Sequence, residues 1–204
     1  MSLLRAILLL VALLRILELA LARRNTRRLL AHGAVEAGRA HYPALVALHL
    51  AWFASLALLP ADLPPVWPWL LLFLILQLLR LWVIASLGRF WTTRVISLPG
   101  APLVCRGPFR FLRHPNYLVV ELELIALPLA FGAPLLALAF GLANAALLAW
   151  RIRVEDRLLA PRRQWAAKTA AASSEPGEAV LENLTSSVAE TGVPAEGASA
   201  KGSS

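Results

Sequence analysis

Long runs of apolar residues, separated by short polar and basic segments, dominate this sequence. As helices, three of the runs are long enough to cross a hydrocarbon core about 30 Å thick, and they cover approximately residues 3–22, 42–59 and 66–87. Two shorter runs, 117–131 and 135–150, are separated only by Gly132, Ala133 and Pro134, which predicts a helical hairpin. The pattern therefore predicts an all-α, polytopic membrane protein with about five transmembrane helices, the last two forming the hairpin.

The segment before the hairpin and the end of the chain differ in composition from these runs. Residues 88–114 are polar and contain the turn-forming pairs Pro99-Gly100 and Gly107-Pro108, so we expect loops or brief strands there. The residues after Arg163 are rich in Ala, Ser, Glu, Gly and Thr and include few large apolar side chains. The sequence therefore predicts a membrane domain over residues 1–163 and a disordered cytoplasmic tail over residues 164–204.

The formal net charge of +8 comes almost entirely from arginine, and the arginines are clustered. The clusters follow the first apolar run, precede the hairpin and follow its second arm. Five crossings with the N-terminus outside place every cluster in the cytoplasm, in agreement with the positive-inside rule. Because no nucleic-acid recognition motif or basic helix face is present, we expect the lipid bilayer as partner and no nucleic acid. The abundance of Ala, Leu and Arg is typical of a GC-rich bacterial genome, and it indicates a bacterial cytoplasmic membrane.

Several classes of soluble protein and metal site are excluded by what the sequence lacks. Cys105 is the single cysteine, which excludes an internal disulfide framework and a cysteine zinc site, and we expect no metal. The sequence contains no GxGxxG, GxxxxGK, HExxH or GxSxG motif, so a soluble nucleotide-binding fold is not indicated.

Ionisable residues lie inside the apolar runs, where they are costly and by default mark a polar site or pathway. Arg15 and Glu18 share one face of the first predicted helix, either as a structural pair facing other helices or with Glu18 in a polar cavity. His49, in the second run, has no other histidine one helical turn away and is expected to be a packed, hydrogen-bonded side chain rather than a ligand. Glu121 and Glu123 interrupt the fourth run.

The start of the hairpin carries a stripe of polar residues. Pro115 suits the first turn of a helix, where its missing N–H is no loss. His114, Tyr117 and Glu121 then step by three and four and share one stripe at the helix entrance. Glu123 points away from this stripe, and because lipid would be prohibitive it should face a protein cavity.

A second polar group, Arg151 with Glu155 and Asp156, follows the last arm of the hairpin. Since the arms of a hairpin return to the same interface, this group can converge with His114. Arginine and carboxylates together match a ligand that bears amino, carboxylate and sulfonium groups. The alternative interpretation is an ordinary basic membrane margin with ion pairs on the helix surface.

The sequence RHPNY at residues 113–117, followed by an apolar hairpin and then by Arg151 with Glu155-Asp156, resembles the isoprenylcysteine carboxyl methyltransferase family. The preceding segments WTTRVI, at 91–96, and GPFR, at 107–110, resemble its bacterial members. The resemblance covers most of the chain, from the first apolar run to about residue 159.

The resemblance implies an integral membrane enzyme that transfers a methyl group from S-adenosylmethionine to oxygen of a lipid-like acceptor. The acceptor would be isoprenylcysteine carboxylate-like or, in bacteria, a hydrophobic phenolic or alkylpyrone compound. By matching motif positions, the resemblance assigns two sets of residues. The cofactor-binding set is Arg113, His114, Pro115, Tyr117 and Asp156, and the catalytic set is Arg151, Glu123 and Glu155. The sequence offers no dimer motif, and the oligomeric state is not predicted.

Two departures and three alternatives accompany the resemblance. Asp156 replaces the family's usual second glutamate, and the segment 160–178 replaces an aromatic and basic segment. One alternative is a phospholipid N-methyltransferase, and another is a nicotinamide-dependent membrane reductase, because similar RHPxY hairpins occur there. In a third, a non-enzymatic scaffold, Glu123→Gln would be silent.

Overall fold

The structure is a computed structural model that describes residues 2–37, 42–60, 62–99, 101 and 104–174. Within these residues it contains five α-helices: α1 (Leu3–Ala31), α2 (Tyr42–Ala57), α3 (Trp67–Leu87), α4 (Pro115–Ala130) and α5 (Pro134–Ser174). The short elements are the strands β1 (Val35–Ala37) and β2 (Val95–Ser97) and the 3-10 helices η2 (Gly88–Phe90) and η3 (Gly107–Arg110). The chain divides into two compact units, residues 1–162 and 163–204.

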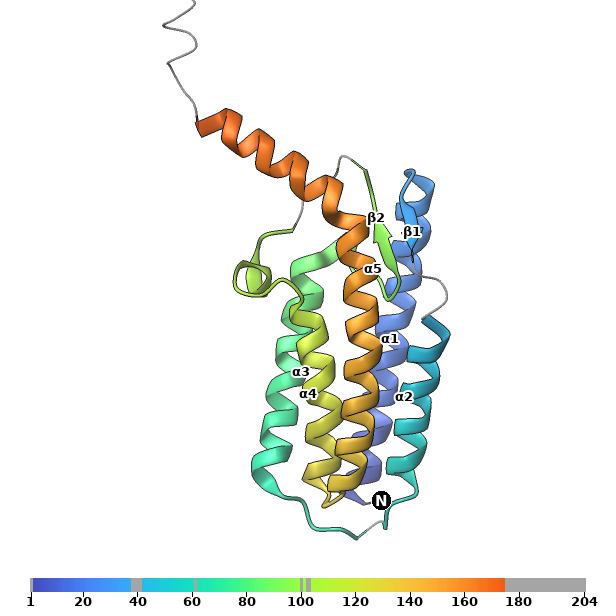
Figure 1. The fold of residues 1–204 in the computed structure, drawn as a ribbon. Coiled ribbons are helices and arrows are strands. Elements are labelled where there is room, and N and C mark those ends of the chain that lie inside the picture. The colour runs from blue at the N-terminus through green and yellow to red at the C-terminus, as the bar shows by residue number, and fades with distance from the viewer. Residues whose placement is uncertain (1, 38–41, 61, 100, 102–103, 175–204) are drawn as a thin grey trace, which may run out of the picture. The chain divides into compact units, whose positions relative to one another are not determined.

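In the first unit, the helices run alongside one another as a bundle (Figure 1). The helix α3 packs extensively against α4, and α1 also contacts α2. Buried apolar side chains from α1 to α4 form the core, including Leu8, Trp52, Phe73, Leu76 and Leu127. Large apolar side chains are also exposed along several helices. They include Leu10 and Ile16 of α1, Leu74 and Leu78 of α3, and Leu138 and Leu142 of α5. Many exposed large apolar side chains on a helical bundle are typical of a membrane-embedded protein.

Two stretches of the described chain are long and apolar enough as helices to cross a membrane, Trp67–Phe90 and Pro134–Ala160. The helix α2 is apolar but shorter, α4 has 16 residues, and α1 carries Arg15 and Glu18 within its apolar part. Length and composition therefore fit a membrane protein in general, whereas the count of five crossings stays a prediction.

The predicted helices are all present, with differences at their ends. The helix α1 continues past the expected end of the first run, near Ala22, to Ala31, because arginine and leucine are good helix formers. The helix α5 likewise continues beyond Arg163 to Ser174, so residues 164–174 of the expected disordered tail are helical, in keeping with their alanine content. The rest of that tail, 175–204, lies outside the described residues.

The expectation of brief strands between α3 and the hairpin is confirmed at one place. The strand β2 pairs antiparallel with β1, with Val35 opposite Ser97 and Ala37 opposite Val95. This two-stranded sheet is a small departure from the predicted all-α class, and it arises because β-branched residues pair across short extended segments. Gly107 begins η3 with a φ of +59°, and a Cβ there would collide with the Ser86 side chain on α3.

Candidate active site

One cluster of polar side chains lies where α4 begins and α5 passes the same end of the hairpin. His114 is the residue before α4, and Tyr117 is in its first turn. The Tyr117 hydroxyl donates a hydrogen bond to Glu155 of α5 and accepts one from Nε of Arg151 at 2.8 Å. The Arg151 guanidinium also lies 5.4 Å from the centre of the Tyr117 ring. The two ends of the hairpin are therefore joined by direct hydrogen bonds.

His114 occupies the centre of this cluster. Its ring stacks on Tyr117, with centroids 5.3 Å apart and planes 12° from parallel. Its Nδ1 lies 3.9 Å from Oε2 of Glu155, and its Nε2 lies 3.4 Å from Oδ1 of Asp156. Two buried atoms here make no hydrogen bond within the described residues, Nε2 of His114 and Oδ1 of Asn116. Because buried polar atoms are normally hydrogen-bonded, these two atoms indicate a place for a polar ligand.

Arg151 is held from a third side by the segment after α3. The Arg151 side chain is buried, and its Nη2 donates to the backbone carbonyl of Thr93 at 2.9 Å. The Thr93 hydroxyl in turn lies 3.3 Å from the Tyr42 hydroxyl at the start of α2. The neighbouring Arg94 bonds to Glu36 of β1 at 3.1 Å. These contacts orient the Arg151 guanidinium toward Tyr117.

A second cluster of charges lies inside the bundle, between α1, α3 and α4. Its members are two arginines, two glutamates and one glutamine: Arg15, Arg80, Glu18, Glu123 and Gln77. Arg15 donates to Glu18 at 2.7 Å and to Glu123 at 3.3 Å, while Arg80 donates to the same two carboxylates at 2.8 and 3.1 Å. The opposite charges are equal in number, so burial does not leave an uncompensated charge.

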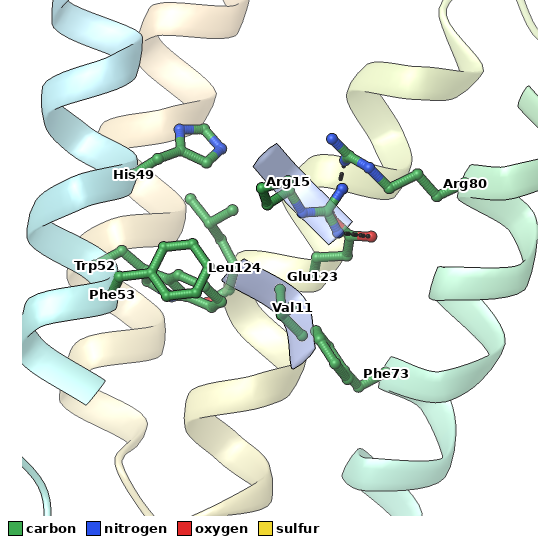
Figure 2. A pocket seen from close by; sticks show the side chains of 9 residues that line it. All are labelled: Val11, Arg15, His49, Trp52, Phe53, Phe73, Arg80, Glu123 and Leu124. Atoms are coloured by element: carbon green, nitrogen blue, oxygen red, sulfur yellow. Dashed lines mark hydrogen bonds and ion pairs between the residues drawn. The ribbon is translucent and has the colours of Figure 1, made fainter. Parts of the chain in front are cut away.

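A small cavity of about 20 Å³ adjoins this interior cluster. Figure 2 shows the side chains around it: Arg15, Arg80, Glu123 and His49 on the polar side, and Val11, Trp52, Phe53, Phe73 and Leu124 on the apolar side. A cavity of this size holds roughly one water molecule. The expectation that Glu123 faces protein rather than lipid is confirmed, because only 4% of the residue is exposed.

The structure brings most of the predicted site residues together. Six of them converge at the end of the hairpin: Arg113, His114, Tyr117, Arg151, Glu155 and Asp156. Pro115 is the first residue of α4. Glu123 does not join them. It lies six residues after Tyr117, or roughly 9 Å further along α4, and it bonds to the interior cluster instead.

For Arg15 and Glu18, the interpretation as a structural pair facing other helices is confirmed. Gln77 and Arg80 were missed, although the same rule about polar residues in apolar runs identifies them. Thr93 acts through its backbone carbonyl, for which the sequence carries no signal.

Comparison with known proteins agrees with this geometry. Residues 69–161, which include the hairpin and both halves of the cluster at its end, match the model of the Isoprenylcysteine carboxyl methyltransferase (ICMT) family. The chain is also 40% identical over 151 residues to the Uncharacterized protein YpbQ of Bacillus subtilis (strain 168), an alignment that covers 71% of this chain and 89% of that protein. No solved structure matches the chain. The chain therefore belongs to the isoprenylcysteine carboxyl methyltransferase family, whose members are membrane methyltransferases.

Proposed function

We propose that this protein is a multi-pass membrane methyltransferase that transfers a methyl group from S-adenosylmethionine to an oxygen of a lipid-like acceptor. The bacterial relative supports a bacterial cytoplasmic membrane as its location. With the five crossings predicted from the sequence, the N-terminus lies outside. The cofactor then enters from the cytoplasm, and the acceptor enters from the bilayer. The observation that carries the proposal is the convergence of cations and carboxylates at the end of the hairpin.

The residues of this cluster fit the polar parts of the cofactor. Arg113 is largely exposed at the rim and suits the carboxylate of its methionine part, since arginine binds carboxylates through paired N–H donors. Glu155 and Asp156 suit the ammonium and the sulfonium charge. Nε2 of His114 and Oδ1 of Asn116, which make no hydrogen bond within the described residues, are further polar atoms that a ligand would satisfy.

In the reaction, the cofactor supplies an electrophilic methyl group on its sulfonium. The protein contributes mainly by holding the reacting oxygen in line with that methyl group, because alignment lowers the barrier more than acid–base assistance does. Arg151 is already fixed by Thr93 and Tyr117, so it presents a preorganised positive charge. Glu155, bonded to the Tyr117 hydroxyl, provides the opposite charge beside it.

Calorimetric binding of S-adenosylhomocysteine, the demethylated product, to detergent-purified protein tests this proposal. We expect saturable binding that weakens at least tenfold in His114→Ala. His32→Ala is a matched control, because His32 is an exposed histidine at the end of α1 and should leave binding unchanged. A folded sample that fails to bind S-adenosylhomocysteine, or that binds a nicotinamide cofactor instead, would contradict the proposal.

The chemical position of the transferred label decides between oxygen and nitrogen acceptors. With radiolabelled S-adenosylmethionine, we expect the label in hydroxyl- or carboxyl-bearing lipophiles. Label on the amine of phosphatidylethanolamine would instead identify a phospholipid N-methyltransferase.

A further inference from the structure

The cavity beside the interior cluster contains one hydrogen-bond acceptor that the protein leaves uncommitted. Nδ1 of His49 lies 2.8 Å from the backbone carbonyl of Leu45. A carbonyl oxygen only accepts, so Nδ1 carries the proton, and Nε2 of the neutral ring presents a lone pair. Figure 2 shows the His49 ring reaching from α2 towards Arg15 on the polar side of the cavity. Within the described residues, no hydrogen bond from protein reaches Nε2.

The charged groups around the cavity are already paired with one another. Both oxygens of Glu123 accept hydrogen bonds, from Arg15, Arg80 and Gln77, and Glu18 is held by the same two arginines. An anionic ligand would have to displace a carboxylate, which leaves a buried charge without a partner at a cost of several kcal/mol. The cavity therefore favours a neutral group that donates a hydrogen bond to Nε2.

The size and lining of the cavity narrow the choice of ligand. A volume of about 20 Å³ accommodates one water-sized group, such as a hydroxyl, but not the two oxygens of a carboxylate. The remaining walls are apolar and include Trp52 and Phe53, whose rings meet edge to face with centroids 5.1 Å apart.

We propose that this cavity receives the hydroxyl of a neutral lipophilic phenol or enol, and that Nε2 of His49 accepts its proton during methyl transfer. This assignment rests on the proposed function and makes the acceptor a hydroxyl compound rather than a carboxylate. A carboxylate loses no proton on methylation, whereas a hydroxyl must, so only a hydroxyl acceptor requires a base here.

The step balances in atoms and charge. Nε2 of His49 takes the proton as the hydroxyl O–H bond breaks. The acceptor oxygen forms a bond to the methyl carbon while the S–CH₃ bond breaks. The sulfonium becomes a neutral thioether, and the positive charge passes to the imidazolium. Glu123 lines the cavity together with His49 and attracts this charge, whereas Arg15, which also lines the cavity, opposes it.

The two sites are arranged along one helix. Tyr117, at the end of the hairpin, and Glu123, at the cavity, are roughly 9 Å apart along α4. A donor bound at Tyr117 with its methyl group directed along α4 approaches the cavity, and the acceptor meets it from the bilayer side.

Methyl-transfer assays with chain-matched acceptors test this inference. The acceptors are a long-chain 4-alkylphenol and a fatty acid. We expect the alkylphenol to be methylated at least tenfold faster than the fatty acid. His49→Gln should slow alkylphenol methylation by about 10²-fold, the lower range for a lost general base.

His32→Gln is the matched control, because His32 makes the same type of bond, from Nδ1 to the Arg28 carbonyl at 2.7 Å, but is exposed and does not line the cavity. It should leave both rates unchanged. Binding of S-adenosylhomocysteine reports whether His49→Gln is folded, and we expect it to be unchanged.

The possible results separate the two proposals. A fatty acid methylated as fast as the alkylphenol overturns the hydroxyl assignment and leaves the proposed function intact, as does equal behaviour of His49→Gln and His32→Gln. If His49→Gln fails to bind S-adenosylhomocysteine, the acceptor preference of the unmodified protein decides the assignment. If the unmodified protein neither binds S-adenosylhomocysteine nor transfers methyl groups, the proposed function fails, and the assignment fails with it.

Discussion

At the scale of single residues, the interior cluster is the most demanding feature of this protein. Arg15, Glu18, Arg80 and Glu123 are all largely buried in a bundle whose surface is apolar. Each carboxylate contacts both arginines, so the loss of any one member leaves a charge without its partner. Replacing a whole buried ion pair by apolar residues is often neutral, whereas breaking it costs about 3–5 kcal/mol.

Glu123→Gln is therefore expected to destabilise the protein by about 3–5 kcal/mol, because it leaves two arginines facing one carboxylate. Glu121→Gln is the matched control on the same helix. Glu121 is only half-buried, and its hydrogen bond comes from the neutral amide of Asn144, so we expect a loss of about 1 kcal/mol or less. Denaturant unfolding in detergent measures both changes, and equal losses in the two variants would contradict this account.

The double variant Glu123→Gln with Arg80→Gln restores the balance of charge. We expect it to be more stable than Glu123→Gln alone, as a double-mutant cycle would show.

At the scale of elements, α4 lacks one internal backbone hydrogen bond, and a side chain of a neighbouring helix supplies the missing donor. Pro128 lies inside α4 and has no N–H, so the Leu124 carbonyl one turn earlier loses its usual donor. The indole Nε1 of Trp52 on α2 donates to that carbonyl at 3.1 Å. This side-chain bond lies one residue from Glu123, so it ties α2 to the part of α4 that carries the interior cluster.

Trp52→Phe is expected to destabilise the protein, because the buried Leu124 carbonyl loses a hydrogen bond worth about 1–3 kcal/mol and the smaller phenyl ring also leaves a cavity in the core. In a Pro128→Ala background the new N–H supplies the missing donor, and the same substitution should then cost less. A double-mutant cycle followed by thermal unfolding measures the coupling. Strictly additive effects of the two substitutions would rule out this role for Trp52.

The elements themselves were largely predictable. Apolar runs, prolines and glycines act locally, so the helices Tyr42–Ala57 and Trp67–Leu87 lie within about two residues of the expected ranges. The extended end of α1 was not predicted, because arginines after Ala22 mark a membrane boundary without ending a helix. The pairing of β1 with β2 depends on a contact between distant segments and has no local signal.

At the scale of the whole molecule, the distribution of arginine predicts that the loop between α3 and α4 faces the cytoplasm. This loop contains Cys105, the single cysteine of the chain, and its side chain is exposed. The turn between α2 and α3, with the exposed Asp62, is expected on the opposite side.

Thiol labelling in intact bacterial cells measures this orientation. A membrane-impermeant maleimide should leave Cys105 unlabelled in intact cells and label it after permeabilisation. In a Cys105→Ser background, Asp62→Cys should show the opposite behaviour and react in intact cells. Labelling of Cys105 from outside would reverse the assigned topology, and labelling of both positions from one side would change the number of crossings.

The sequence by itself determined the helices and the meeting of the two hairpin ends. Helix formation depends on local periodicity, and the two ends of a hairpin return to the same place however the helices are rotated. Only the tertiary structure decided the partners of Glu123, which bonds to Arg15 at a separation of 108 residues and to Arg80 at 43. It also decided which carbonyl Trp52 satisfies and which atom of His49 faces a cavity. These features depend on how each helix is rotated against its neighbours, and that rotation is set by packing over the whole bundle rather than by any single segment.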